Sequence, residues 1–294
     1  MRREAIMENI EFKYIDTNGI TLHVALAGPE DGELVILLHG FPEFWYGWRN
    51  QIDALVRSGY RVAVPDQRGY NKSDKPAGRK AYTIDILAQD IAGLIKSMDR
   101  EDAFIIGHDW GGAVGWHLAA THPEVVRGFI AVNIPHMGVF PRVLLQAPSQ
   151  LIRSIYMAFF QLPILPERLM RTKDFEHMAK GIRRTGRAGA FTAGALESYK
   201  SAWREPGALS GMLNWYRALP FSINKINTDR INVPVKIIWG DKDPFLSKKL
   251  AAESLKFTDT REVTWVHGAT HWVHLEEPHT VNREIFTFIT AVVK

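Results

Sequence analysis

The chain has 294 residues, of which 46% are hydrophobic and 23% charged, so it is long and apolar enough to bury a full core without crosslinks. It contains no cysteine, which excludes disulfide bonds, a thiol nucleophile and a thiolate metal site. The net charge of +4 is modest for this length and gives no reason to expect a nucleic-acid partner.

The N-terminal part of the chain predicts a pair of strands and no targeting segment. Residues 1–5 are basic, but no long apolar region follows them. No part of the chain reaches the roughly 18 uninterrupted apolar residues of a membrane span. We therefore expect a cytoplasmic protein without a membrane partner. Strands are expected at 10–14 and 20–27, and Asn18-Gly19 between them favours a hairpin turn with positive φ.

Further along, short apolar runs alternate with amphipathic stretches, a pattern typical of an α/β protein. The later strands are rich in Val and Ile and bounded by Gly, as expected of strands that are buried on both faces. Further strands are predicted at 34–38, 61–65, 103–106, 128–132, 235–239 and 261–266. Helices are predicted at 47–58, 83–98, 112–121, 248–256 and 280–293.

Residues 135–232 do not keep this alternation. The segment is rich in Met, Phe, Leu, Arg and Ala, and its prolines divide it into several helices. We interpret it as a helical cap inserted between the sixth and seventh core strands, over the strand ends where such a sheet binds ligands. The expected domains are therefore a core of residues 1–134 and 233–294 and a cap of residues 135–232.

Within this segment, basic residues gather between positions 171 and 187. A nucleic-acid surface could have such a composition. Asp174 and Glu176 interrupt the run, however, and this favours an ordinary solvated helical face. The basic residues are Arg171, Lys173, Lys180, Arg183, Arg184 and Arg187.

Asp109 lies at the centre of the most informative motif, Gly107-His108-Asp109-Trp110-Gly111-Gly112. The motif follows a predicted strand and precedes a predicted helix, and its small residues permit the sharp turn called a nucleophile elbow. The usual central residue is serine, which attacks a carbonyl carbon. A carboxylate in its place suits attack on a saturated, electrophilic carbon, which leaves an ester on the protein for water to cleave.

A second loop would support this chemistry. His39-Gly40-Phe41-Pro42 follows the third predicted strand. A main-chain N–H from this loop and that of the residue after the nucleophile can form an oxyanion hole, so the expected donors are Phe41 and Trp110. We expect His39 and His108 to shape their loops rather than to transfer protons.

An acid and a histidine after the last two strands would complete the site. Asp243 and His271 follow Asp109 in the chain order nucleophile, acid, histidine. The acid would hold the proton of one imidazole nitrogen so that the other nitrogen can deprotonate water. A carboxylate nucleophile is already ionised near neutral pH, so the base is needed only in the second step. Asn133, after the sixth strand, is not an acid, which argues against an acid from that position.

Both choices have neighbours that remain alternatives. Asp241 is an alternative to Asp243, although it suits local turn hydrogen bonds with the backbone. His267 and His274 are alternatives to His271, and His274 is expected to begin a helix.

With these motifs the chain resembles the epoxide hydrolases of the α/β-hydrolase fold over nearly its full length. The implied fold is a mostly parallel eight-stranded sheet flanked by helices, with an inserted helical cap. The resemblance rests on residues 39–46, 107–112, 239–244 and 268–272, and on the cap motifs Tyr156-Met157-Ala158-Phe159-Phe160-Gln161 and Asn214-Trp215-Tyr216-Arg217.

The resemblance implies a hydrolase acting on ether bonds, which would use water to convert small apolar epoxides to vicinal diols. Tyr156 and Tyr216 would donate hydrogen bonds to the epoxide oxygen, because a phenol can both hydrogen-bond and protonate a developing alkoxide. Tyr46 and Tyr199 are expected to serve in packing. No metal or organic cofactor and no nucleic-acid partner are implied, and the expected state is a monomer or homodimer. The expected substrate-binding residues are Phe44, Trp110, Met137, Phe140, Leu144, Phe159, Leu213 and Trp215.

Three alternatives remain. Haloalkane dehalogenases share the aspartate elbow and the following tryptophan, but they usually have Asn after the first His-Gly, where this chain has Phe41. Haloacetate dehalogenases need cationic side chains where this chain has Trp110 and Ala113. A hydrolase-like fold that only binds a ligand is also possible, since fold does not fix function, but it would not need so complete a set of catalytic residues.

Overall fold

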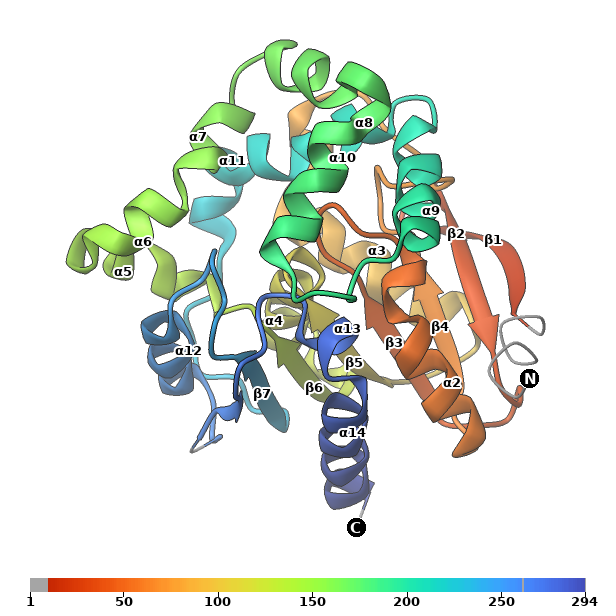
Figure 1. The fold of residues 1–294 in the computed structure, drawn as a ribbon. Coiled ribbons are helices and arrows are strands. Elements are labelled where there is room, and N and C mark those ends of the chain that lie inside the picture. Colours follow the sequence, from red (N-terminus) through yellow and green to blue (C-terminus); the bar gives the residue numbers. More distant parts are fainter. Residues whose placement is uncertain (1–9, 261, 294) are drawn as a thin grey trace.

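The computed structural model describes residues 10–260 and 262–293. Its strands are β1 (Glu11–Thr17), β2 (Ile20–Ala27), β3 (Leu34–Leu38), β4 (Arg61–Pro65), β5 (Ala103–His108), β6 (Val126–Val132), β7 (Val235–Gly240) and β8 (Thr264–Val266). They form one sheet in the order β1-β2-β4-β3-β5-β6-β7-β8, shown in Figure 1. β2 is antiparallel to both of its neighbours, and all other neighbouring pairs are parallel. The predicted fold, a mostly parallel eight-stranded sheet, is confirmed.

The two edges of the sheet differ most from the predicted strand boundaries. β1 continues three residues beyond the predicted end because it pairs with β2 down to the turn, where Thr17 faces Ile20. Asn18 and Gly19 both have positive φ, 44° and 73°, so the predicted hairpin turn is confirmed. At the other edge, β8 begins at Thr264 rather than at residue 261, which lies outside the described residues.

The sheet is buried on both faces because its side chains alternate between two hydrophobic clusters. Val35 and Leu37 of β3 pack in one cluster, with side chains of α2 and α14, whereas Ile36 and Leu38 pack in the other, with side chains of α3 and α4. The core helices are α2 (Arg49–Arg57), α3 (Ile84–Ser97), α4 (Trp110–Thr121), α12 (Lys248–Ser254), α13 (Val273–Glu276) and α14 (Pro278–Val293).

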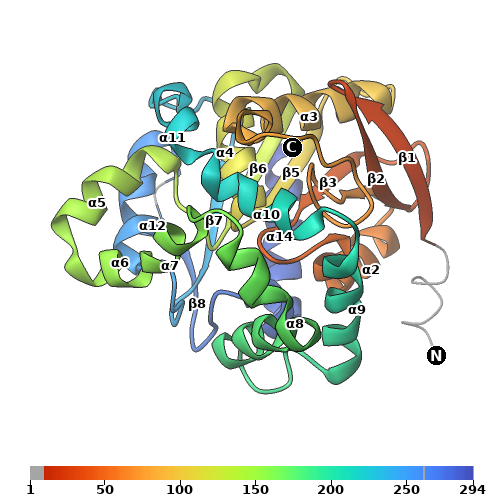
Figure 2. The same ribbon diagram turned by 90° about the horizontal axis from the view of Figure 1, so that it is seen from above.

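Between β6 and β7 the chain forms helices and no strand. These are α5 (Phe140–Gln146), α6 (Pro148–Arg153), α7 (Ile155–Phe160), α8 (Leu165–Thr185), α9 (Ala193–Arg204), α10 (Ala208–Arg217) and α11 (Leu219–Ser222), with short 3-10 turns beside them. Figures 1 and 2 show them gathered on one side of the sheet, opposite the end at which α14 projects. Proline opens α6, and proline is the second residue of α8 and α11, in agreement with the breaks expected from the sequence. The division into a core and a cap domain stays a prediction.

Two buried tryptophans fix this helical segment, hereafter the cap, to the core. The indole N–H of Trp203 donates to the carbonyl of Pro42 at 2.7 Å, and that of Trp215 donates to the carbonyl of Arg68 at 2.9 Å. Both side chains are almost fully buried, so each hydrogen bond satisfies a donor that water does not reach. Among the described residues, no helix is both long and apolar enough to cross a membrane.

Candidate active site

The elbow at Asp109 joins β5 to α4, and glycines beside it let neighbouring backbone segments pack closely. Asp109 has φ 49° and ψ −124°, a strained combination for a residue other than glycine. A Cβ on Gly111 would lie 2.3 Å from the carbonyl oxygen of Leu38, and one on Gly40 would lie 2.4 Å from the Cβ of Asp109. Glycine is therefore required at both positions, and the strained turn presents the Asp109 carboxylate beyond the end of the sheet.

Three loops at the same edge of the sheet bring Asp109, Asp243 and His271 together. The imidazole Nδ1 of His271 lies 2.8 Å from Oδ2 of Asp243, and its Nε2 lies 3.6 Å from Oδ2 of Asp109. The side chains of His271 and Asp243 are 4% and 1% exposed, whereas that of Asp109 is 13% exposed. The distance of 3.6 Å between Nε2 and the Asp109 carboxylate is longer than a hydrogen bond, and Asp109 is the most exposed of the three side chains.

Backbone and amide donors fix the orientation of Asp243. Its Oδ1 accepts the N–H groups of Phe245 and Leu246 at 2.7 and 2.9 Å. Its Oδ2 accepts the side-chain N–H of Asn133 at 2.6 Å, and Asn133 in turn accepts the Gly240 N–H at 2.9 Å. The sequence indicated only that Asn133 could not be the acid; its contacts show that it orients the acid.

The sequence neighbours of the acid and the histidine lie elsewhere. Asp241 accepts the Gly268 N–H at 2.8 Å and faces the ring of His267, whose side chain is 85% exposed. His274 is fully buried in α13 and faces Glu43. Of the candidates, only Asp243 faces His271, and of the three histidines only His271 faces Asp109.

Charge interactions govern protonation in this triad. Burial lowers the pKa of His271, but the carboxylates of Asp243 and Asp109 outweigh burial and raise the pKa to about 10. Burial conversely raises the pKa of Asp109, but His271, His108 and the Phe41 N–H outweigh it and hold that pKa below its usual range. In the free protein His271 is thus an imidazolium between two carboxylates.

This arrangement makes a testable prediction for the titration of His271. We expect the ring to stay protonated until the pH approaches 10 and to deprotonate at least about one pH unit lower in Asp109→Asn, which removes one carboxylate charge. Because the folded pKa lies above the unfolded value of about 6.5, this group stabilises the fold fully below that pH, and the contribution is lost as the pH rises through about 10. NMR of labelled histidine measures both proteins, with the exposed His267 as an internal control. A wild-type midpoint near neutrality would contradict the prediction.

One of the two predicted oxyanion donors contacts Asp109. The Phe41 N–H donates to Oδ1 of Asp109 at 2.9 Å, which leaves Oδ2 on the side of His271. Trp110 is the first residue of α4, where a backbone N–H lacks an intrahelical acceptor. Its donation to an oxyanion stays a prediction.

Two cap phenols face Asp109. Tyr156 lies on α7 and Tyr216 on α10, with ring centroids 6.0 Å apart, and both line the two cavities that Asp109 also lines. Burial, with a contribution from the charge of Asp109, raises the pKa of both phenols, so they are protonated and able to donate. The side-chain N–H of Gln161 donates to the Tyr216 carbonyl at 2.8 Å, and Nε of Arg217 donates to the Phe160 carbonyl at 2.9 Å, which holds α7 against α10.

The two cavities have volumes of about 250 and 180 Å³ and share Asp109, Tyr156 and Tyr216. Trp110 and three further predicted residues, Met137, Phe140 and Leu144, line the smaller cavity. The larger one is lined by residues that the sequence analysis did not identify, among them Phe160, Met170, Met178, Ile182, Phe245 and Trp272.

Four predicted substrate-binding residues do not line either cavity. Leu213 is fully buried, and Trp215 is held by its hydrogen bond to the core. Phe44 packs against the rings of Tyr46 and Tyr199, at centroid distances of 5.9 and 5.6 Å. Phe159 lines a separate surface groove of the cap. A role in substrate binding stays a prediction for these four, and composition does not show which face of a helix or loop meets the cavity.

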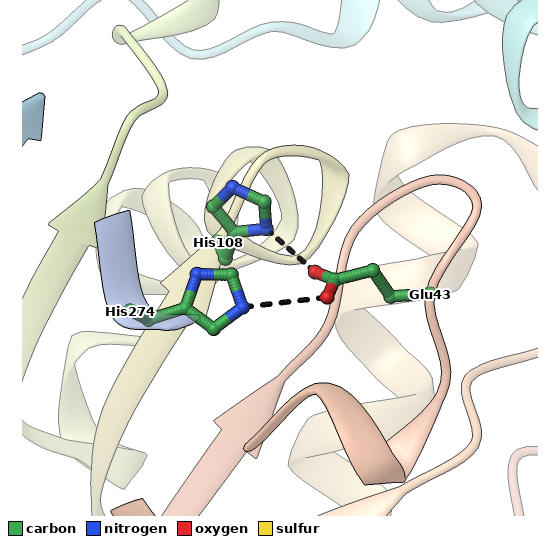
Figure 3. A group of neighbouring side chains, drawn as sticks. All are labelled: Glu43, His108 and His274. Atoms are coloured by element: carbon green, nitrogen blue, oxygen red, sulfur yellow. Dashed lines mark hydrogen bonds and ion pairs between the residues drawn. The ribbon is translucent and has the colours of Figure 1, made fainter. Parts of the chain in front are cut away.

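A buried polar cluster lies beside the triad and comprises Glu43, His108 and His274 (Figure 3). Nδ1 of His108 lies 2.9 Å from Oε2 of Glu43, and its Nε2 lies 2.9 Å from the His271 carbonyl oxygen. Both partners are hydrogen-bond acceptors, so each ring nitrogen of His108 faces an acceptor. Burial lowers the pKa of His274 to about 4, and this neutral ring faces the other oxygen of Glu43 at 3.4 Å.

This cluster also reaches the cap, because the Tyr199 hydroxyl donates to Oε1 of Glu43 at 2.9 Å. One buried carboxylate thus links the elbow, the loop of His271 and α9. The ligand atoms of Glu43, His108 and His274 lie within 4.8 Å of one another, as a metal site would require. Hydrogen bonds alone account for their arrangement, however, and a metal would have to displace the proton by which His108 pairs with Glu43. We therefore assign the cluster no metal.

The chain is similar in sequence to several known proteins. A family model described as alpha/beta hydrolase fold matches residues 33–278. The chain is 50% identical over 283 residues to the AB hydrolase superfamily protein YfhM of Bacillus subtilis (strain 168), covering 96% of this chain and 99% of that protein. It is 37% identical to human Epoxide hydrolase 4, covering 94% of this chain and 77% of that protein.

The chain is also similar to solved structures of epoxide hydrolases. The crystal structure of Bacillus megaterium epoxide hydrolase in complex with an inhibitor superposes with a TM-score of 0.85 at 32% identity, covering 95% of this chain and 100% of that one. A mutant of that enzyme has been solved with its product, (R)-3-[1]naphthyloxy-propane-1,2-diol.

Proposed function

Because this chain belongs to the α/β-hydrolase fold family and, within it, to the epoxide hydrolases, which are hydrolases of ether bonds, we propose that it converts epoxides to vicinal diols through an ester on Asp109. One observation carries the proposal. Asp109, which would attack carbon, and Tyr156 and Tyr216, which would receive the ring oxygen, line the same two cavities. A homologue without catalytic activity would not need these three side chains around the same cavities.

In the first step, Oδ2 of Asp109 attacks one carbon of the three-membered ring. A C–O bond to the carboxylate forms while the ring C–O bond breaks, and the ring oxygen takes a proton from a cap phenol. Tyr156 and Tyr216 suit this role because both are protonated and line the cavities that Asp109 lines. The Phe41 N–H holds Oδ1 and so leaves Oδ2 as the attacking atom.

In the second step, His271 deprotonates a water that attacks the ester carbon of Asp109. Ester formation removes a negative charge that helps raise the pKa of His271, so after the first step the imidazolium gives its proton to the phenolate left by ring opening and becomes a base. The Phe41 and Trp110 N–H groups would stabilise the oxyanion on the tetrahedral carbon. Collapse breaks the bond between this carbon and the alkoxide oxygen, which comes from Asp109. The alkoxide takes the proton of the new carboxyl group and leaves as the diol, while the water oxygen stays in the regenerated carboxylate.

Apolar walls on both cavities favour an apolar epoxide. Aromatic rings and methionines surround the larger cavity, and aliphatic and aromatic side chains surround the smaller one. The three-membered ring would lie where the cavities share Asp109, with its substituents in the cavities. The naphthyloxy group in the product of the Bacillus megaterium relative favours an aryl substituent of that kind.

The haloalkane dehalogenase alternative depends on Trp110 as a donor to the leaving halide. The indole of Trp110 packs edge-on against Tyr216, with centroids 5.1 Å apart. Trp110 therefore lies against a phenol that the epoxide mechanism uses, and this placement favours epoxide opening over halide release.

Diol formation from racemic styrene oxide tests the function and the tyrosines together. We expect the wild-type protein to form diol and Tyr156→Phe/Tyr216→Phe to be slower by at least about 10³-fold, since general acid catalysis contributes about 10²- to 10⁴-fold. Tyr14→Phe/Tyr60→Phe, which removes two phenols far from the cavities, is the matched control and should keep full activity. Halide release from haloalkanes in place of diol formation would contradict the proposal.

A further inference from the structure

The outer surface of the cap carries a run of large apolar side chains that water reaches. Of the thirteen exposed large hydrophobic residues in the described part of the chain, eight fall between positions 145 and 169, and their exposed fractions range from 44% to 89%. Single exposed apolar residues are ordinary, but such a concentration marks an interaction surface. This cap strip consists of Leu145, Leu151, Ile152, Ile155, Leu162, Ile164, Leu165 and Leu169.

The cap strip follows the outline of the molecule. Its residues lie on α5, α6, α7, the connection to α8 and the first turns of α8. Both views show α5, α6 and α7 on the side away from the strands β1 and β2, and α8 over the middle of the cap (Figures 1 and 2). The exposed side chains of the strip therefore extend over several helices of the cap.

Positive charge accompanies the apolar side chains. Residues 140–173 contain five basic residues and one acidic residue, a net charge of +4, and Asp174 and Glu176, which follow, pair with Arg204 and Lys200. The acidic residue, Glu167, is itself neutralised by the buried Arg217 at 2.6 Å. Arg168, Arg171 and Lys173 are exposed and form no ion pair with another described residue.

The same surface adjoins the larger active-site cavity. A groove beside the cap strip is lined by six residues, including Leu169 of the strip and Met170 and Met178. Met170 and Met178 also line the larger cavity that contains Asp109. Met170 and Met178 therefore lie between the larger cavity and the groove beside the cap strip.

We propose that the cap strip docks on the surface of a membrane containing anionic lipids. The leucines and isoleucines would enter the boundary between headgroups and acyl chains, and Arg168, Arg171 and Lys173 would lie near the lipid phosphates. A second copy of this chain suits the strip less well, because a two-fold contact would bring these unpaired cations together. This differs from the absence of a membrane partner expected from the sequence, which reflected only the lack of a spanning segment.

Such docking would also explain the position of the groove. If the chain has the proposed function, its apolar epoxide substrates would dissolve in the membrane, and docking would bring the groove and the methionines that it shares with the larger cavity close to them. The docking itself does not rest on the proposed function, because it depends only on the surface of the cap.

Co-sedimentation with lipid vesicles, without any substrate, tests the proposal. We expect the wild-type protein to bind vesicles of phosphatidylcholine mixed with phosphatidylglycerol at least about tenfold more tightly than vesicles of phosphatidylcholine alone, and to bind less as salt is added. Arg168→Gln/Arg171→Gln should weaken binding to the mixed vesicles by about 20- to 30-fold, from about a kilocalorie per mole for each cation near the surface. Leu145→Ser/Ile152→Ser/Ile155→Ser should weaken it by at least about tenfold.

Matched variants separate the cap strip from general surface properties. Phe12→Ser/Tyr14→Ser/Val293→Ser removes three exposed apolar side chains elsewhere, and Lys13→Gln/Lys96→Gln removes two exposed cations elsewhere. Both controls should bind as the wild type does, and circular dichroism should show that all variants are folded. The proposal is wrong if the wild-type protein binds the mixed vesicles no more tightly than vesicles of phosphatidylcholine alone. It is also wrong if the cap variants bind the mixed vesicles as tightly as the controls do. It is also wrong if sedimentation shows a wild-type dimer that the cap variants abolish, because a second copy then covers the strip.

Discussion

Asp109→Asn should lower kcat for diol formation by about 10⁴- to 10⁶-fold, the range seen when a covalent nucleophile is removed from a hydrolase. The amide has the shape of the carboxylate and can still accept the Phe41 N–H, now at 2.9 Å, so the elbow should keep its fold. It lacks the negative charge that attacks carbon. Steady-state diol formation from styrene oxide measures the loss, and Asp241→Asn, a neighbouring carboxylate bound to another loop, is the control.

The origin of the added oxygen tests the same residue independently. In a single turnover in ¹⁸O-labelled water, the first diol should contain no label, because its new oxygen comes from Asp109. Label should enter the carboxylate and reach the diol only in later turnovers. A labelled first diol, or Asp109→Asn with more than about a hundredth of wild-type kcat, would show that water attacks the epoxide directly.

His271→Gln should separate the two steps of the reaction. The nucleophile and both phenols remain, so ring opening should proceed, while hydrolysis of the ester loses its base and slows by about 10⁴-fold or more. We expect the intact protein to gain the mass of one epoxide, with the adduct on the peptide that contains Asp109. Mass spectrometry of the protein mixed with excess styrene oxide measures this directly.

His267→Gln is the matched control, because it replaces a histidine of the same loop that is exposed and faces Asp241. It should turn over normally and accumulate no adduct. If His271→Gln neither consumes epoxide nor gains mass, then His271 acts in the first step, and the assignment of the base to ester hydrolysis is wrong.

The sequence was sufficient for the positions of the triad because these depend on strand ends. Asp109, Asp243 and His271 each follow a parallel strand, and the carboxyl ends of neighbouring parallel strands meet at one edge of a sheet. Whether the acid was Asp241 or Asp243 could not be decided by pattern, since both lie in the same turn. Hydrogen bonds from Phe245, Leu246 and Asn133 decide which of them faces the histidine, and Asn133 comes from a strand 110 positions away.

The pocket lining and the Glu43 cluster could not be predicted from the sequence, for a different reason. Leu213 and Tyr216 lie on the same side of a regular helix, yet Tyr216 lines both cavities and Leu213 is fully buried and lines neither. Glu43 is a charged residue in a loop, a type that is almost always exposed. Its burial depends on His108, Tyr199 and His274, and the nearest of these is 65 positions away.

The cap leaves the core from β6 and returns in β7, and these two strands are direct neighbours in the sheet. To the core, segment 133–234 is therefore a single long loop with adjacent ends, and the entropy of closing such a loop changes only slowly with its length. Caps of different length or sequence could replace one another in evolution or by grafting while Asp109, Asp243 and His271 stay in place. What a transplanted cap must retain is its attachment: a hydroxyl for Glu43, as Tyr199 provides, and a donor for the Pro42 carbonyl, as Trp203 provides.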